Sequence, residues 1–282
     1  MHELRIWGST ISKENLSPTD WIYLSKVPQE LPSLKWVWNE IDRVWQQMEL
    51  DNKRPLQGQA IDEFYGHPVW IMNGLFTEVD PVSKGHRQAI AEFLATFLPA
   101  RIADYGGGWG SLAKIVAKKI PHAMVDIIEP YPVRSLLESI RNESRIHLVR
   151  KLSAKYDAII AQDVLEHIED PVFKAFSLSD KVERNGVVIF ANCFYPYVQC
   201  HLPKNFHLRH TFVFVMKAMG LRYLGPVQGA THALVFKRMG SLNLAQARRM
   251  EAISRCFGAV LNLIVQTLSI AKGGIPHEDC PH

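Results

Sequence analysis

The sequence predicts an α/β protein in which a parallel sheet is covered by helices on both faces. Between about residues 99 and 239, apolar runs typical of strands alternate with segments of helical periodicity. A glycine-rich turn, residues 105–110, follows the first of these runs and leads into Leu112, Ile115, Val116 and Ile120 at helical spacing. A second apolar run, residues 124–129, ends in a carboxylate. This order of strand, glycine turn, helix and acid is typical of α/β folds that bind nucleotide cofactors.

Seven strands are expected in this central region. They lie near residues 101–105, 124–129, 146–149, 157–162, 186–192, 221–226 and 231–238. A glycine turn, Asn185–Gly186, precedes the fifth strand, and the short turn around Gly229 is compatible with a hairpin between the last two.

Composition limits the class of protein. The 282 residues are 47% hydrophobic, which is enough for one substantial α/β core and an appendage. The net charge of +4 arises from 32 basic and 28 acidic residues without a long block of like charge, so we expect no nucleic-acid partner. Four cysteines show neither a disulfide framework nor zinc-site spacing, and the first residues lack a secretory signal. We therefore expect a cytoplasmic protein.

The amino-terminal part, residues 1–98, is predicted to contain helices and loops but no strand-rich stretch. Ser17–Pro18 and Ser33 are typical helix starts, and Trp36, Trp38 and Trp45 lie in the helix that follows Ser33. We expect these tryptophans to form a packing face rather than a platform on which substrate stacks. Asp80–Pro81 predicts the start of a helix over Val82–Phe97, just before the first strand of the sheet.

The glycine turn carries a family resemblance. Asp104-Tyr105-Gly106-Gly107-Gly108-Trp109-Gly110 has the spacing Asp-x-Gly-x-Gly-x-Gly, whereas a dinucleotide fingerprint would need glycine at position 111, which is Ser. This turn, the acid-ending run Met124–Glu129 and the segment Tyr156–Pro171 resemble, in this order, three motifs of the class I S-adenosylmethionine (SAM) dependent methyltransferases. A tight turn without a ligand is the alternative for the glycines taken alone.

The resemblance implies a Rossmann-like fold and a division of the chain. The fold is a seven-stranded, mostly parallel sheet whose last strand runs antiparallel, with a helical amino-terminal extension and a carboxy-terminal helix. The implied parts are a helical extension or lid over 1–98, a SAM-binding core over 99–239 and a helical tail over 240–282. Within the extension, Tyr65 and His67 are candidate lid residues.

The resemblance also assigns cofactor residues. Asp104 orients the loop and the methionine amino group, Glu129 holds the ribose hydroxyls, and Gln162 and Asp163 line the cofactor after the fourth strand. The remaining candidates are the loop residues Tyr105, Gly106, Gly107, Gly108 and Gly110, together with Pro130. Relatives often have an acid for adenine after the third strand, but Arg150–Ser153 contains none, so backbone groups and an apolar wall such as Leu152 would take its place.

The predicted reaction is methylation of a small molecule, at oxygen first and nitrogen second. Methyl transfer is a direct displacement that needs alignment, exclusion of water and a proton acceptor. His167, just past the fourth strand, is the first candidate base. The loop after the fifth strand offers His201, His207 and His210 as alternatives.

Three other interpretations stay open. Asp163-x-x-Glu166-His167 with the later His210 resembles the acid-x-x-Glu-His…His pattern of metal-dependent methyltransferases that act on RNA termini or quinones, and would suit a divalent ion. A non-catalytic SAM-fold protein that holds a partner is the second. A nucleic-acid methyltransferase is the third, disfavoured because no Asn/Asp-Pro-Pro-aromatic signature follows the fourth strand.

The tail contains an apolar run, Cys256 to Ala271, interrupted by Asn262 and Gln266. Because a membrane span needs about 20 apolar residues, a span is not expected. Packing on the amino-terminal helices or in a homodimer is preferred over a position in a membrane interface.

Overall fold

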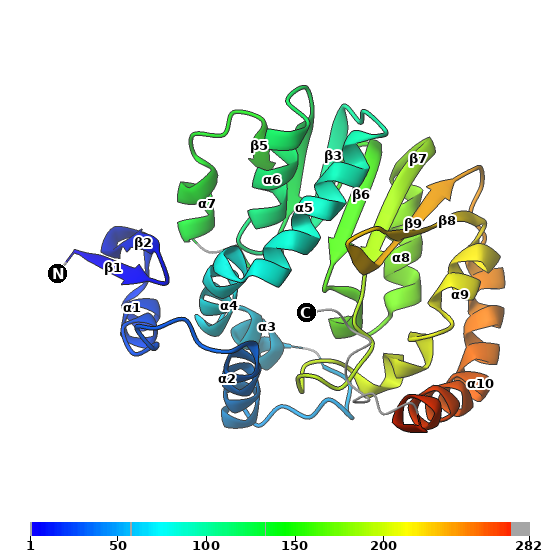
Figure 1. Cartoon of the computed structure of the whole chain (residues 1–282), viewed down its shortest axis with the longest axis horizontal. Coiled ribbons are helices and arrows are strands. Elements are labelled where there is room, and N and C mark those ends of the chain that lie inside the picture. The colour runs from blue at the N-terminus through cyan, green and yellow to red at the C-terminus, as the bar shows by residue number, and fades with distance from the viewer. Residues whose placement is uncertain (1, 57, 133, 272–282) are drawn as a thin grey trace.

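A seven-stranded sheet forms the centre of the molecule in the computed structural model, which describes residues 2–56, 58–132 and 134–271 (Figure 1). Its strands are β3 (Arg101–Tyr105), β4 (Met124–Ile128), β5 (Ile146–Leu148), β6 (Tyr156–Gln162), β7 (Val182–Ala191), β8 (Leu221–Val227) and β9 (Ala230–Arg238). The order across the sheet is β5-β4-β3-β6-β7-β9-β8. Strand β9 pairs antiparallel with β7 and β8, whereas the pairs among β3 to β7 are parallel. The predicted fold class and the antiparallel last strand are confirmed.

The direction in which the chain crosses the sheet reverses beside β3. From β3 the chain proceeds outward to β4 and β5, and then returns to β6 on the other side of β3. In open α/β sheets, ligands bind at such a reversal, outside the carboxyl ends of the strands. The topology therefore directs attention to the ends of β3 and β6.

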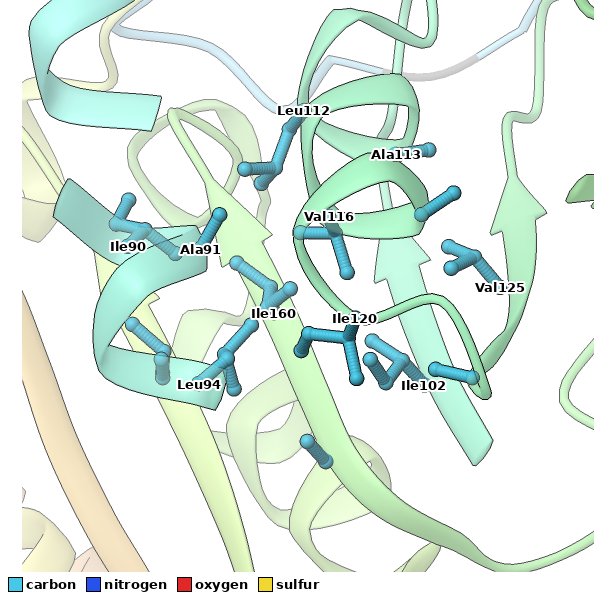
Figure 2. Packing of buried hydrophobic residues seen from close by; sticks show 14 of the residues in the cluster. Ile90, Ala91, Leu94, Ile102, Leu112, Ala113, Val116, Ile120, Val125 and Ile160 are labelled. Carbon is cyan, nitrogen blue, oxygen red and sulfur yellow. The ribbon is translucent and has the colours of Figure 1, made fainter. Parts of the chain in front are cut away.

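Helices cover both faces of the sheet. One face is covered by α5 (Pro81–Ala95), α6 (Ser111–Lys119) and α7 (Arg134–Ile140), and the other by α8 (Pro171–Asp180), α9 (Phe212–Met219) and the start of α10 (Leu244–Ala271). Figure 2 shows Leu94 and Val116 directed toward Ile102 and Ile160 of the sheet. Burying each such side chain contributes about 1.5–3 kcal/mol. Helix α5, which the sequence assigned to the amino-terminal extension, thus packs on the central sheet.

The amino-terminal part begins with a hairpin that the sequence did not predict. Strands β1 (Glu3–Ile6) and β2 (Ser9–Ser12) pair antiparallel around Trp7–Gly8, where φ is 48° and 90°. The expectation that residues 1–98 lack strands was therefore wrong. Each strand has only four residues, and tryptophan is an uncommon residue at positive φ, so neither periodicity nor turn chemistry indicated a hairpin.

Short helices complete this part of the chain. They are the 3-10 helix η1 (Lys13–Asn15), α1 (Pro18–Leu24), α2 (Leu34–Gln47), α3 (Gln59–Tyr65) and α4 (Val69–Val79). The predicted starts are confirmed: Ser17 forms a capping box, and Ser33 and Asp80 accept backbone N–H bonds at the starts of α2 and α5. Helix α5 ends at Ala95 rather than Phe97. Helix α4 was missed because it is apolar nearly all round, which removes the helical periodicity.

The described part of α10 packs on its own chain, against α9 and the 3-10 helix η3 (Pro203–Leu208). Buried Glu251 of α10 accepts hydrogen bonds from Arg248 and Arg255. Although burial opposes ionisation, these contacts and the nearby His207 lower the pKa of Glu251 to about 2. The expected packing on the amino-terminal helices or in a homodimer concerned the apolar run 256–271, and most side chains of that run lie outside the described residues, so both stay predictions. Within the described residues, none of the helices has the length and apolar character to cross a membrane.

The close approach of α10 to η3 gives a first testable prediction. A Cβ at Gly258 would lie 2.5 Å from the carbonyl oxygen of His207. We expect Gly258→Ala to displace α10 and to lower the free energy of unfolding by about 1–3 kcal/mol, measured by urea and thermal unfolding. Gly85→Ala in α5 is the matched control. A Cβ at this position meets nothing within 4 Å, and the substitution replaces a glycine inside a helix by a residue that favours the helix. Equal stability of the two variants would contradict the described docking of α10.

Candidate active site

A cavity of about 590 Å³ lies at the carboxyl ends of β3, β4 and β6. Its floor is formed by the loops after these strands, and its remaining walls by α2, α3, α4 and the segment after β7. In Figure 1, α2, α3 and α4 gather at one end of the sheet, and residues from each of these helices line the cavity. The reversal of strand order and the cavity therefore coincide.

The glycine turn lies against this cavity with two distinct roles for its residues. Gly106, Gly107 and Gly108 line the cavity. Gly106 has φ +72° and its Cβ would lie 2.5 Å from Val164, whereas a Cβ at Gly108, with φ +51°, would meet no atom within 4 Å. Gly110 does not line the cavity but begins α6 in the left-handed conformation, with Leu136 and Ile127 against it. Three of the four predicted glycines thus line the cavity, with open space beside Gly108 alone, and the fourth serves packing.

Two carboxylates flank the glycine turn. Asp104 is buried, and its Oδ2 has no hydrogen-bond partner within the described chain. Burial raises the pKa of Asp104 to about 7, against the opposing effect of nearby Arg87. Glu129 is held in place because it accepts hydrogen bonds from the backbone N–H groups of Gly108 and Tyr131, at 2.8 and 3.0 Å. A free buried acid and a fixed acid on either side of bare backbone fit the ammonium and ribose groups of SAM.

The other predicted cofactor residues also line the cavity. These are Tyr105, Pro130, Gln162 and Asp163. Asp163 has φ +54°, an unusual value for a residue other than glycine, and accepts a hydrogen bond from Gln162 Nε2 at 3.2 Å. Leu152 is not among the lining residues and packs instead against the apolar cluster on the α8 side of the sheet.

The cavity also contains a cation that the sequence did not indicate. Arg87 of α5 lines it close to Asp104 and Asp163, and its Nη1 donates to the carbonyl oxygen of Thr77 at 2.7 Å. Burial lowers the pKa of Arg87, and these carboxylates oppose that shift. The position of Arg87 on the helix directly before the first strand of the sheet was the signal that could have indicated it. Asp80–Pro81 predicted where this helix begins, but not which of its side chains face the cavity.

A compact group of Glu166, His167 and His201 lies deeper in the cavity. The ring centroids of the two histidines are 4.8 Å apart. Burial, with His201 nearby, lowers the pKa of His167 to about 3, and burial lowers that of His201 to about 4. Burial and the charge of Asp163 raise the pKa of Glu166 to about 8. Burial therefore favours the neutral form of each of these three side chains in the free protein.

The two other histidine candidates lie elsewhere. His207 does not line the cavity; its Nε2 faces Glu251 of α10 at 3.7 Å and its Nδ1 lies 2.8 Å from the carbonyl oxygen of Lys204. His210, further along the same segment, is also absent from the lining. Because η3 turns the chain toward α10 after residue 202, only His201 of the three is brought to His167.

Aromatic side chains form the wall opposite the glycine turn. Tyr65 and Trp70 present ring edges to His167, with centroids 6.1 and 6.2 Å away, and Trp38 stacks on Tyr197 at 4.9 Å. All four side chains line the cavity. Trp38, which was expected only to pack against the core, is therefore also a cavity residue. Trp45 is buried in the core, as predicted.

The two lid candidates of the amino-terminal part separate in the structure. Tyr65 lines the cavity. His67 does not, and packs edge to face on Tyr23 with ring centroids 5.0 Å apart.

Comparison with known proteins agrees with this geometry. Residues 83–214 match a family model described as a methyltransferase domain. No curated protein matches the sequence. An O-methyltransferase family protein from Burkholderia thailandensis superposes with a TM-score of 0.52 at 15% identity, over 73% of this chain and 70% of that one. Human N-acetylserotonin methyltransferase, solved with SAM, gives 0.50 at 15% identity, over 79% and 70%. At this identity the superpositions concern the fold.

The fold and the cavity define an α/β protein in which a glycine turn flanked by two acids, named here the glycine-and-acid cradle, lines a cavity at the reversal of strand order. With the match over 83–214, the class becomes specific. Residues 83–214 thus form a methyltransferase domain of the kind that uses SAM.

Proposed function

We propose that this enzyme methylates a hydroxyl oxygen of a small molecule with a flat, apolar body. The observation that carries the proposal is that one cavity is lined by the glycine-and-acid cradle, by aromatic side chains and by His167, whose ring contacts Tyr65 and Trp70. Aromatic walls favour planar apolar ligands because ring contacts add to the free energy gained by burial. A hydroxyl on such a ligand can then face both the methyl donor and the imidazole.

The cofactor role of each residue follows from its position. Asp104 would hold the methionine ammonium group, Glu129 the ribose hydroxyls, and the bare backbone of Gly106–Gly108 would allow close approach. Gln162 and Asp163 would contact the cofactor from the end of β6. Bound SAM supplies an electrophilic methyl group on a sulfonium, so the protein must align the acceptor and exclude water.

His167 is the proposed proton acceptor. Its Nδ1 lies 3.2 Å from the carbonyl oxygen of Cys200, which only a protonated nitrogen can bind, so Nε2 keeps its lone pair. Burial lowers the pKa of His167 to about 3, so the ring is neutral at physiological pH and its Nε2 lone pair is not occupied by a proton. The cavity position of His201 makes it the second candidate, ahead of His207 and His210.

The amino-terminal part is proposed to act as the acceptor-binding cover of the site. Helices α2, α3 and α4 contribute Trp38, Tyr65 and Trp70 to the cavity wall. The boundary of this part near residue 98 stays a prediction.

Two measurements test the proposed function. Isothermal titration with SAM should give one site per chain, and release of S-adenosylhomocysteine should appear with members of a panel of hydroxylated aromatic compounds. The same panel carrying amines in place of hydroxyls is the control for the atom methylated. Turnover of the amines alone would show that nitrogen, not oxygen, is methylated. Absence of SAM binding would contradict the proposed methyltransferase function.

Arg87 supplies a further prediction about the cofactor. It is the cation that lies near Asp104, so we propose that it binds the methionine carboxylate of SAM. Arg87→Gln is expected to weaken SAM binding by roughly 10-fold to 100-fold, measured by titration. Arg145→Gln is the matched control, because Arg145 also donates to a backbone carbonyl, that of Ala117, but does not line the cavity. An unchanged affinity of Arg87→Gln would overturn this role.

A further inference from the structure

Three side chains in the cavity are grouped as metal ligands commonly are. Glu166, His167 and His201 each offer one ligand atom, and these atoms all lie within 4.8 Å of one another. Two of the residues come from the 3-10 helix η2 (Leu165–His167) after β6, and the third follows β7. Two imidazoles and one carboxylate form a donor set that binds divalent transition metals and leaves positions open for a ligand.

The surroundings orient both rings. His167 Nδ1 lies 3.2 Å from the carbonyl oxygen of Cys200, and His201 Nδ1 lies 2.6 Å from that of Tyr195. A backbone carbonyl that accepts from one ring nitrogen fixes the tautomer and leaves the lone pair on Nε2, which is the usual arrangement of histidines that bind metals. Both Nε2 atoms are thus prepared to act as ligands.

Glu166 supplies the independent observation. Its side chain is fully buried and lines the cavity, and one oxygen, Oε1, accepts from the backbone N–H of Cys193 at 2.8 Å. The other oxygen, Oε2, is buried without a hydrogen-bond partner within the described chain. Leaving a buried carboxylate oxygen unpaired costs free energy, and a bound cation would remove that cost.

We propose that Glu166, His167 and His201 bind a divalent transition metal ion whose open position faces the cavity. This set differs from the one expected from the sequence, since His201 takes the place of His210 and Asp163 lies beside the set rather than within it. The binding site stands independently of the acceptor, but its role rests on the proposed function.

In that role, the ion binds the acceptor hydroxyl and lowers its pKa. The O–H bond breaks and the proton passes to Asp163, which lines the same cavity. The oxygen then forms a bond to the methyl carbon as the carbon–sulfur bond breaks, and the sulfur keeps the electron pair as S-adenosylhomocysteine leaves. His167 is thus the proton acceptor of the metal-free enzyme and a ligand of the ion in the metal-loaded enzyme, where Asp163 takes the proton.

The test is titration of the metal-stripped full chain with Co²⁺, followed through its visible absorption bands, with Zn²⁺ as competitor. We expect one ion per chain, displaced by Zn²⁺. His201→Ala and Glu166→Gln should each weaken Co²⁺ binding at least about 100-fold. His122→Ala is the matched control, because His122 is exposed and outside the cavity, and it should bind as the parent does.

SAM titration of the same samples checks the fold and separates the two proposals. If SAM binds to the parent but Co²⁺ does not, or if both variants bind Co²⁺ as tightly as the parent, the metal site is overturned and the methyltransferase proposal stands. If Co²⁺ binds but SAM does not, the proposed function fails and the metal site stands. If Glu166→Gln does not fold, the Co²⁺ affinity of His201→Ala decides the question, provided that this variant still binds SAM.

Discussion

Asp104→Asn is expected to weaken SAM binding by at least about 100-fold and, at the same time, to stabilise the free chain. The loss of affinity follows because the amide has no charge for the methionine ammonium group. The gain in stability follows because Asp104 is buried with one oxygen unpaired, and burial raises its pKa to about 7. SAM titration and thermal unfolding of the ligand-free protein measure the two effects.

The pH dependence of this stability has a definite sign. A carboxyl group whose pKa is raised by folding binds its proton more tightly in the folded state, so the parent loses stability as pH rises from about 4 toward 7. Asn does not titrate, so the variant should gain relative to the parent over that range. At pH 8 we expect an advantage of at most about 4 kcal/mol, because the pKa of Asp104 rises from 3.8 to about 7 on folding, and little advantage at pH 4.

Asp126 provides the matched control for this prediction. It is also a buried acid on a central strand, but it accepts hydrogen bonds from Tyr156 at 2.8 Å and Arg101 at 3.2 Å and does not line the cavity. Asp126→Asn should therefore lower stability and leave SAM affinity unchanged. If Asp104→Asn instead lost stability and kept its affinity, Asp104 would be a structural acid like Asp126.

The parts of the fold that the sequence predicted are those in which local pattern and tertiary environment agree. The runs at β3, β4 and β6 are apolar because both faces of the sheet are covered, and the glycine turn appears wherever backbone must approach a ligand. The parts that were missed lack a local signal. The hairpin β1–β2 turns at a tryptophan, and α4 is buried nearly all round.

The active site was only partly predictable for a related reason. Asp104 and Glu129 follow directly from strand ends, so their convergence could be inferred from parallel strands alone. The choice among three histidines could not be made this way, because it depends on where η3 begins: the chain places His201 beside His167 and carries His207 to Glu251. Arg87 and Trp38 belong to helices whose contact with the cavity depends on packing, which spacing within a helix does not reveal.

His167→Ala is expected to reduce the turnover number by about 100-fold to 10,000-fold while leaving the dissociation constant for SAM within about twofold. The imidazole lines the cavity beside Tyr65 and Trp70, so its removal affects the proposed acceptor side of the cavity and leaves the contacts proposed for the cofactor. The turnover number from S-adenosylhomocysteine release and the affinity from titration are compared in one buffer.

His210→Ala is the matched variant for this second prediction, since it removes an imidazole from the same chain at a residue outside the cavity. It should keep the turnover number of the parent. Loss of turnover in His210→Ala with activity retained in His167→Ala would show that the base lies in the segment after β7. That result would contradict the assignment of the base to a residue that lines the cavity. Equal loss in both variants with weakened SAM binding would indicate damage to the fold rather than to proton transfer, because Asp104, Glu129 and the glycine turn contact neither ring in any interaction described above.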